Sequence, residues 1–347
     1  MSARFLPGAD LSARFYADVV RPLLGNRPHA AALLGWGSDV LGYDTPRSTD
    51  HGWGPRVLVF LSREDDAAQM TDELTLRLPT HAEGWPVRFG WDGRPDMHHV
   101  TVTTVAGWLT EHLGVDVTAG MSTTDWLVTP QQRLLGVVAG RVHADPDGAL
   151  GAVRRRLAWY PDQVWRWLLA CQWHRLAQEE AFVARTAEVG DELGSAVIAA
   201  RLVRDMMRLA LLMNRRYAPY GKWLGTAFAR GRHDDDLPRH LADAVHAAER
   251  ERREDALAAA YLALARRHDA SGLTEPVDAH IGSYHDRPAR VVMADRFTEA
   301  LLAGVTDGQL SRLPLVGGVD QLVDSTDALS DPGTFRRLAS LYGLPLG

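Results

Sequence analysis

A glycine–serine turn and a later aspartate carry the clearest chemical signal in this sequence. An apolar run that ends at Leu34 leads into Gly37-Ser38, and Asp50 follows about a dozen residues later. The backbone N–H groups and the serine hydroxyl of such a turn can hold phosphate oxygens. A carboxylate on the neighbouring strand can hold Mg²⁺, which bridges those phosphates. The pattern therefore predicts a phosphate site at Gly37 and Ser38 and a metal ligand at Asp50.

The same residues also have simpler explanations. A single Gly-Ser turn is a common feature of loops, and Asp50 is equally suited to capping a helix or accepting a buried hydrogen bond. Trp53 is either a packing residue or a stacking platform for a base or an aromatic substrate. Arg56 has a simple role as the ion-pair partner of Asp50.

A second group of charged residues lies in the C-terminal half. Arginines recur at helical spacing along a predicted helix over 199–216, at Arg201, Arg204, Arg208 and Arg215. They form either its solvated face, with Asp205 pairing locally, or a wall of a cleft between domains that meets an anion. The second interpretation assigns Arg204 to a cofactor phosphate and Arg208 to the substrate.

The single lysine of the chain, Lys222, stands in the aromatic segment YAPYGKW at 217–223. A compact ammonium group beside aromatic rings suits a triphosphate or a carboxylate. In that interpretation Lys222 binds the cofactor, and Tyr217 and Tyr220 contact the substrate. The alternative is an ordinary surface lysine.

Secondary-structure patterns divide the chain at about residue 145. In the first part, apolar runs predict strands over 29–34, 57–61, 87–91 and 100–105. Helical spacing predicts helices over 11–24, 67–78 and 106–113. The sequence therefore predicts an α+β chain, with a mixed sheet and helices in a domain over 1–145.

The remainder, 146–347, is predicted to be a mainly α-helical domain. Helical patterns dominate 150–230, and a further helix over 239–268 is expected to break near Glu249. Tryptophans gather in this part, and we expect them to pack between helices.

Composition limits the function classes. The chain has 347 residues, a net charge of -6 and one cysteine, so a nucleic-acid partner, a disulfide framework and a cysteine-based zinc site are not expected. No apolar run approaches the roughly 18 residues of a membrane span, and no secretory signal is visible. We therefore expect a cytoplasmic protein, away from membranes, whose partner is a small molecule, with a nucleotide as one alternative. The composition indicates no oligomeric state.

The turn and its surroundings resemble the polymerase-β-like nucleotidyltransferase superfamily. That superfamily has a hydrophobic residue, Gly and Gly or Ser, then roughly ten residues and Asp-x-Asp or Asp-x-Glu. The wider sequence resembles one branch of that superfamily more closely, the DUF4037 nucleotidyltransferase-like proteins. The matching phrases include GSDVLGYDTPRSTDHGWGPRVLVFL, LAWYPDQVWRW, RLVRDMMRLALL, RRYAPYGKWLGTAFAR and VDQLVDSTDALSDP. The resemblance implies a nucleotidyltransferase-like domain over 1–145 followed by the helical C-terminal domain.

The sequence departs from that pattern at the metal ligands. The resemblance implies carboxylates at 50 and 52, but the chain has Asp50-His51-Gly52. On a strand, residues 50 and 52 would share a face, so Gly52 removes the second ligand. The segment 100–105, where the superfamily has its third carboxylate, contains no acid. The acids available nearby are Asp39, Asp44, Asp92 and Asp96.

Two function classes remain open at this point. In the first, Mg²⁺ at Asp50 and an NTP at Ser38 and Lys222 transfer a nucleotidyl group to a small hydroxylated acceptor. In the second, the fold is catalytically repurposed or non-catalytic and binds a small molecule or nucleotide without metal, and a cyclisation or rearrangement in a biosynthetic pathway belongs to this class.

Overall fold

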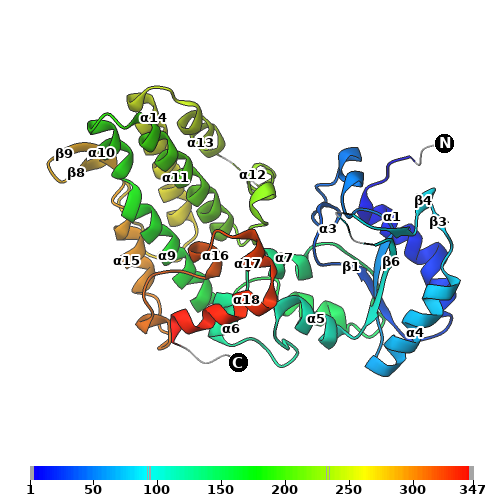
Figure 1. The fold of residues 1–347 in the computed structure, drawn as a ribbon. Coiled ribbons are helices and arrows are strands. Elements are labelled where there is room, and N and C mark those ends of the chain that lie inside the picture. Colours follow the sequence, from blue (N-terminus) through cyan, green and yellow to red (C-terminus); the bar gives the residue numbers. More distant parts are fainter. Residues whose placement is uncertain (1–3, 92, 94, 232, 234, 344–347) are drawn as a thin grey trace. The chain divides into compact units, whose positions relative to one another are not determined.

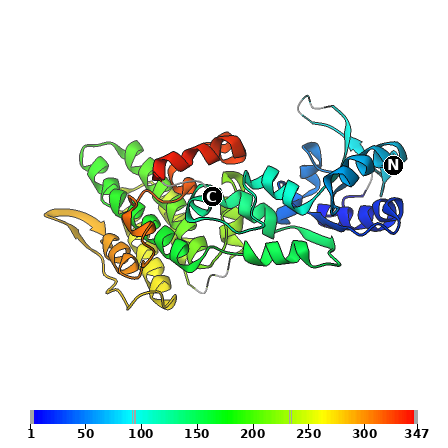
Figure 2. The same cartoon turned by 90° about the horizontal axis from the view of Figure 1, so that it is seen from below.

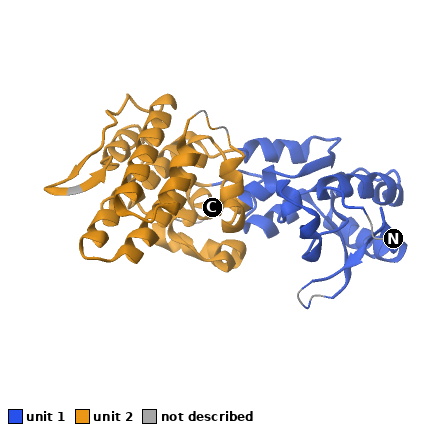
Figure 3. Cartoon of the chain, turned by 90° about the horizontal axis from the view of Figure 1, so that it is seen from above, with its two compact units in different colours: residues 1–121, 133–158, 347 blue, residues 122–132, 159–346 orange. Residues whose placement is uncertain are grey.

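The computed structural model describes residues 4–91, 93, 95–231, 233 and 235–343. Its contacts divide the chain into two compact units (Figure 3). Unit 1 comprises 1–121, 133–158 and 347, and unit 2 comprises 122–132 and 159–346.

A five-stranded mixed sheet forms the centre of unit 1, in the order β5-β6-β2-β1-β7 (Figure 1). Its middle strands β1 and β2 are antiparallel, whereas β2 and β6 are parallel. The bounds are β1 (Ala30–Leu33), β2 (Arg56–Phe60), β5 (Arg88–Phe89), β6 (Met97–Thr103) and β7 (Arg141–Ala144). A separate short hairpin joins β3 (His81–Ala82) and β4 (Trp85–Pro86). The predicted strands 29–34 and 57–61 are confirmed, whereas the edge strand β7 was not predicted.

Helices cover both faces of this sheet. One face packs against α1 (Gly8–Phe15), the π turn η1 (Tyr16–Val20), α2 (Arg21–Leu24) and α4 (Glu64–Arg77). On the other face, Trp108 of α5 (Val105–Leu113) meets Phe60 edge-on, with ring centroids 5.9 Å apart. The apolar run of β2 is continuous because helices bury both of its faces.

Unit 2 is built from long helices, and its core is rich in aromatic side chains. The longest helices are α9 (Asp162–Glu179), α11 (Glu192–Met213) and α14 (Arg250–Ala270). Trp173 of α9 stacks on Phe297 of α15 (Asp295–Leu302), with ring centroids 4.2 Å apart. The expected packing role holds for Trp167 and Trp173, which are both fully buried. The predicted α+β class, a mixed sheet followed by a mainly helical part, is confirmed.

The predicted break near Glu249 is also confirmed. The helix α13 (Leu237–His246) ends before Glu249, and α14 begins at Arg250 with Glu249 extended at its N-terminus. The hairpin of β8 (Gly282–Tyr284) and β9 (Arg287–Val291) projects from the helices of this unit (Figures 1 and 2).

Shorter helices complete the chain. They are α3 (Ser38–Leu41), α6 (Thr123–Val128), α7 (Gln131–Val138), α8 (Ala149–Arg156), α10 (Phe182–Glu188), α12 (Gly221–Ala229), α16 (Val319–Leu322), α17 (Thr326–Ser330) and α18 (Pro332–Arg337). Single 3-10 turns are η2 (Pro46–Asp50), η3 (Leu310–Arg312) and η4 (Leu338–Tyr342).

Candidate functional site

The glycine–serine turn lies directly after β1, as the sequence predicts. Gly37 has φ +121°, and Ser38 begins the four-residue helix α3. A Cβ atom at Gly37 would lie 2.7 Å from Nη2 of Arg56. Only glycine fits this position because both the backbone angle and the neighbouring guanidinium exclude a side chain.

A buried ion pair closes the space beneath the turn. Nη2 of Arg56, the first residue of β2, lies 2.7 Å from each carboxylate oxygen of Asp39, and its Nε donates to Oδ2 at 3.2 Å. The same Nη2 donates to the carbonyl oxygen of Trp36 at 3.0 Å, and the guanidinium lies 4.5 Å from the Trp36 ring. Arg56 therefore pairs with Asp39, and the expectation that it pairs with Asp50 is wrong.

Asp50 lies on a helical turn and not on a strand. It is the exposed last residue of η2, while β2 begins only at Arg56. Pro46 and the mutual hydrogen bonds of Thr45 and Ser48 start this turn. The expectation that residues 50 and 52 share a strand face is therefore wrong, because a local cap bends the chain before the strand begins.

Aromatic side chains surround Gly52, where the resemblance implies a second carboxylate. Gly52 has φ +61°, and a Cβ atom there would lie 3.1 Å from Trp36 and 3.3 Å from Trp91. The rings of Trp36 and Trp91 are 5.5 Å apart, and the His51 ring lies 6.3 Å from Trp91. The turn after β1 and the segment before β2 are therefore in contact, but the contact is made by aromatic side chains and not by carboxylates.

His99 of β6 extends the aromatic group toward Arg56, with which it is paired across the parallel strands. Its ring lies 5.3 Å from that of Trp91 and 4.1 Å from that of Phe89. Burial lowers the pKa of His99, so this imidazole is neutral at pH 7. A neutral ring beside the arginine adds no charge to the turn region.

The other described acids near the turn are held by hydrogen bonds or exposed to solvent. Asp44 accepts hydrogen bonds from the backbone N–H of Gly8 at 2.6 Å and from Nε1 of Trp53 at 3.0 Å. Asp96 is exposed, and Asp92 lies outside the described residues. Within the described part of the chain, no three His, Cys, Asp or Glu side chains are placed to hold a metal ion. The residues around the turn therefore do not fit a two-metal centre.

Trp53 has a packing role in this region. It is buried, stacks on Phe5 at 5.5 Å and meets Trp85 edge-on at 4.7 Å. Its only polar atom donates to Asp44. This geometry supports the packing interpretation of Trp53 and not the stacking platform.

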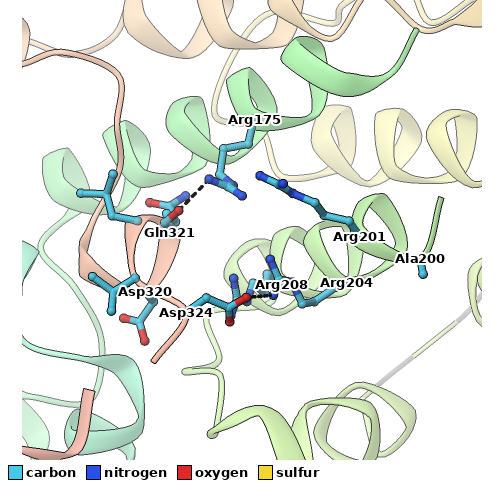
Figure 4. A pocket seen from close by; sticks show the side chains of 10 residues that line it. Arg175, Ala200, Arg201, Arg204, Arg208, Asp320, Gln321 and Asp324 are labelled. Atoms are coloured by element: carbon cyan, nitrogen blue, oxygen red, sulfur yellow. Dashed lines mark hydrogen bonds and ion pairs between the residues drawn. The ribbon is translucent and has the colours of Figure 1, made fainter. Parts of the chain in front are cut away.

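The arginine-rich face of α11 borders a cavity of about 480 Å³ within unit 2 (Figure 4). Arg201, Arg204 and Arg208 line it together with Arg175 of α9. The segment 320–324, which includes most of α16, supplies the opposite wall. Arg215 is not part of this face, because it lies beyond the end of α11 and pairs with Asp162 at 3.4 Å.

One buried carboxylate, Asp205, lies behind these arginines. Its Oδ2 accepts a hydrogen bond from Arg175 at 3.3 Å. Its Oδ1 lies 3.8 Å from Nη1 of Arg208 and 3.9 Å from Nε of Arg204, and no described group donates a hydrogen bond to it. A further carboxylate, Asp324, meets Nη1 of Arg204 at 2.6 Å.

The aromatic segment 217–223 does not line this cavity. Tyr217 is buried against Trp159 and Tyr160, with ring centroids 4.7 and 5.2 Å away, and burial raises its pKa. The Tyr220 hydroxyl accepts a hydrogen bond from Nε1 of Trp223, and Lys222 lies 5.1 Å from the Trp223 ring.

Sequence reasoning missed Arg175, Asp320 and Asp324 as members of the cavity. One signal was available for Arg175, because it is a charged residue between the buried Trp173 and Leu176 of α9. For Asp320 and Asp324 no local signal exists, since they reach α11 through tertiary packing alone.

Comparison with known proteins finds a family resemblance over a segment that spans 133–158 of unit 1 and the first helices of unit 2. The model of a domain of unknown function, DUF4037, matches residues 126–224. The predicted resemblance to the DUF4037 family is confirmed over this segment. The DUF4037 segment contains α9 and α11, and therefore all four cavity arginines, but neither the Gly37-Ser38 turn nor Asp50.

The chain is also similar to a solved structure, that of a nucleotidyltransferase-like protein from Exiguobacterium sibiricum. The identity is 12%, the likeness covers 86% of this chain and 90% of that chain, and the TM-score is 0.35. A likeness this distant supports no argument about the site. No curated protein matches the chain. Among the described helices, none combines the length and apolar character needed to cross a membrane.

The Arg56–Asp39 pair yields a first prediction. Replacing one member alone, by Arg56→Met or Asp39→Leu, leaves a buried charge without its partner and should lower the free energy of unfolding by about 3–5 kcal/mol. The double variant Arg56→Met/Asp39→Leu should lose much less than the sum of the single variants. Urea unfolding measures all three. Additive losses, or single losses below about 1 kcal/mol, would show that the pair does not hold the turn.

Gly52 yields a second prediction, with Gly42 as its matched control. Gly42 has φ +67° with open space around its Cβ position, so Gly42→Ala should lose only about 1–2 kcal/mol of backbone strain. Gly52→Ala adds a clash with Trp36 and Trp91 and should lose about 1–3 kcal/mol more. Equal losses by thermal unfolding would contradict the packed aromatic environment of Gly52.

Proposed function

We propose that this chain is a small-molecule-binding member of the nucleotidyltransferase-like fold that works without a metal ion. Whether it is an enzyme or a binding protein, the chemistry at the glycine–serine turn is then no longer nucleotidyl transfer. The observation that carries the proposal is the buried Arg56–Asp39 pair, which neutralises the acid closest to the turn. Asp44 is similarly held by Trp53 and Gly8.

Loss of converging carboxylates argues against two-metal transfer on physical grounds. In-line displacement on a nucleotide needs ions that stabilise both the attacking and the leaving oxygen. Asp50 alone offers one monodentate or bidentate ligand on an exposed turn, and the next acid is not within its element. A single exposed carboxylate binds Mg²⁺ weakly, because this ion gives up its water reluctantly.

The cavity beside α11 supports a small-molecule ligand. Its volume of about 480 Å³ lies in the range of roughly 300–1,000 Å³ typical of small-molecule sites. The overall charge of -6 disfavours a polyanionic macromolecule as the partner.

Nucleotidyl transfer remains the competing proposal, because Gly37, Ser38 and the exposed Asp50 stand in the order that the resemblance implies. In that proposal Mg²⁺ is held by Asp50, and the phosphates of an NTP are held by Gly37 and Ser38. The two proposals differ in the role of the metal ion.

Calorimetric titration with each NTP separates them. We expect any nucleotide affinity to be the same in Mg²⁺ and in EDTA and to be unchanged in Asp50→Asn, because Asp50 has no metal to hold. An affinity that requires Mg²⁺ and falls at least about tenfold in Asp50→Asn would overturn the proposal. Glu64→Gln, a change of an exposed acid at the start of α4, is a control for a general loss of negative charge.

A further inference from the structure

The arginines of the unit 2 cavity are not fully paired. Nε of Arg175 and Nε of Arg204 are buried and have no hydrogen-bond partner among the described residues. Arg208 has a side chain that is only 16% exposed, and its one ion-pair contact among them is to Asp205. Its nearest carboxylate atom, Oδ1 of Asp205, is 3.8 Å away, which is too far for a hydrogen bond. Burial, and the neighbouring charge of Arg204, lower the pKa of Arg208. A guanidinium in this state gains free energy from any anion that reaches it.

Like charges also face each other here. Arg175 and Arg201 extend toward one another from α9 and α11 (Figure 4). Each is tethered at one side, Arg175 to the carbonyl oxygen of Gln321 at 2.7 Å and Arg201 to Glu179 at 3.0 Å. An anion between the two guanidinium groups would relieve their repulsion.

The charge balance of the cavity includes one exposed carboxylate, that of Asp324. Arg175, Arg201, Arg204 and Arg208 are set against Asp205, Glu179, Asp320 and Asp324, so the cavity is nearly neutral as it stands. Asp324 is the exception among these acids, because 73% of its side chain is exposed and it follows the end of α16. If the Asp324 side chain turns outward into solvent, the cavity gains one net positive charge and Arg204 loses this ion-pair partner.

We propose that this cavity binds a small molecule through a phosphate group, and that Asp324 occupies the phosphate position when the ligand is absent. The site lies within unit 2 and is the cavity that supports the small-molecule function proposed above, so this inference rests on that function; it does not depend on the metal-free chemistry proposed for the turn in unit 1. Several guanidinium groups suit a phosphate better than a carboxylate, because a phosphate presents three acceptor oxygens to separate donors. Leu322 and Val323 line the same cavity and give an apolar surface for the rest of the molecule.

Asp320 adds a dependence on pH. Its carboxylate accepts a hydrogen bond from the backbone N–H of Gln131 at 2.9 Å, and burial raises its pKa to about 6. The charge of Arg208 on α11 favours the ionised form of this carboxylate, and burial together with the carboxylate's charge raises the pKa values of Tyr160, before α9, and Tyr342, in η4. Because Asp320 takes up a proton below pH 6, the cavity becomes more positive there and should bind a dianion more tightly.

Titration of the full chain with inorganic phosphate and with glycerol phosphate at pH 7.5, without NTP or metal, tests the proposal. We expect saturable binding of one phosphate, weakened roughly tenfold or more in Arg208→Gln and largely kept in Arg208→Lys. Arg239→Gln removes an exposed arginine of α13 and should change nothing. Asp324→Asn should bind phosphate several-fold more tightly, and this variant keeps the fold because its side chain is exposed.

Three results would overturn the proposal. They are no saturable phosphate binding, equal affinity in the wild type and Arg208→Gln, or tighter binding of succinate than of phosphate. A failure here leaves the metal-free character proposed for the turn in unit 1 untouched, since that part is tested by the nucleotide titrations with Mg²⁺ and EDTA.

Sulfate isolates the effect of Asp320, because sulfate stays a dianion at both pH 5.5 and pH 7.5. We expect sulfate to bind more tightly at pH 5.5, and we expect Asp320→Asn to remove most of that difference. Sulfate affinity that is equal at the two pH values, in a wild type that binds it, would overturn the role given to Asp320.

Discussion

The site region of unit 1 depends on the buried pair of Arg56 and Asp39. The arginine opens β2 and the aspartate lies in α3, so their contact fixes the turn after β1 against the start of the next strand. Two charges removed from water cost free energy, and excellent geometry is needed to recover it. Here a bidentate contact, a carbonyl oxygen and an aromatic face together satisfy the guanidinium. Asp39 is therefore part of the ion pair that fixes the turn, and its carboxylate is not available to a metal ion.

The two units differ in how far their buried charged groups are paired. Around Gly37 and Ser38 the nearby acids are paired or hydrogen-bonded, and rings fill the remaining space. In the cavity of unit 2, by contrast, Nε of Arg175, Nε of Arg204 and Oδ1 of Asp205 are buried without a hydrogen-bond partner among the described residues. Such groups are uncommon in native proteins and are typically explained by a bound water, an ion or a functional role. The segment that matches the DUF4037 model contains this cavity's arginines, so the family resemblance and the unsatisfied charges coincide.

The sequence predicts well those features that neighbouring residues along the chain determine. Continuous apolar runs gave β1 and β2, and the break before Arg250 followed from the change in pattern near Glu249. Helical spacing also placed Arg201, Arg204 and Arg208 on one face, because three- and four-residue offsets decide that geometry alone.

Features that depend on tertiary contacts were missed or mistaken. The sequence pattern predicts a strand at Asp50, but Pro46 and the Thr45 cap start a helical turn there. The sequence favours Asp50, the nearer acid along the chain, as the partner of Arg56, whereas the fold brings Arg56 to Asp39. The strand β7 is short and half-buried, so its pattern did not stand out, and its partner β1 lies far away in the chain.

Asp39 and Asp44, the acids beside the glycine–serine turn, are held by an ion pair and by hydrogen bonds, and we expect them not to form a metal centre with Asp50. Electron paramagnetic resonance of Mn²⁺, titrated into the chain, measures this directly because only the free ion gives the sharp signal. The account predicts that the free-ion signal with the protein equals that of buffer alone at stoichiometric concentrations. Loss of one equivalent of the signal in the wild type, restored by Asp39→Asn or Asp50→Asn, would contradict it.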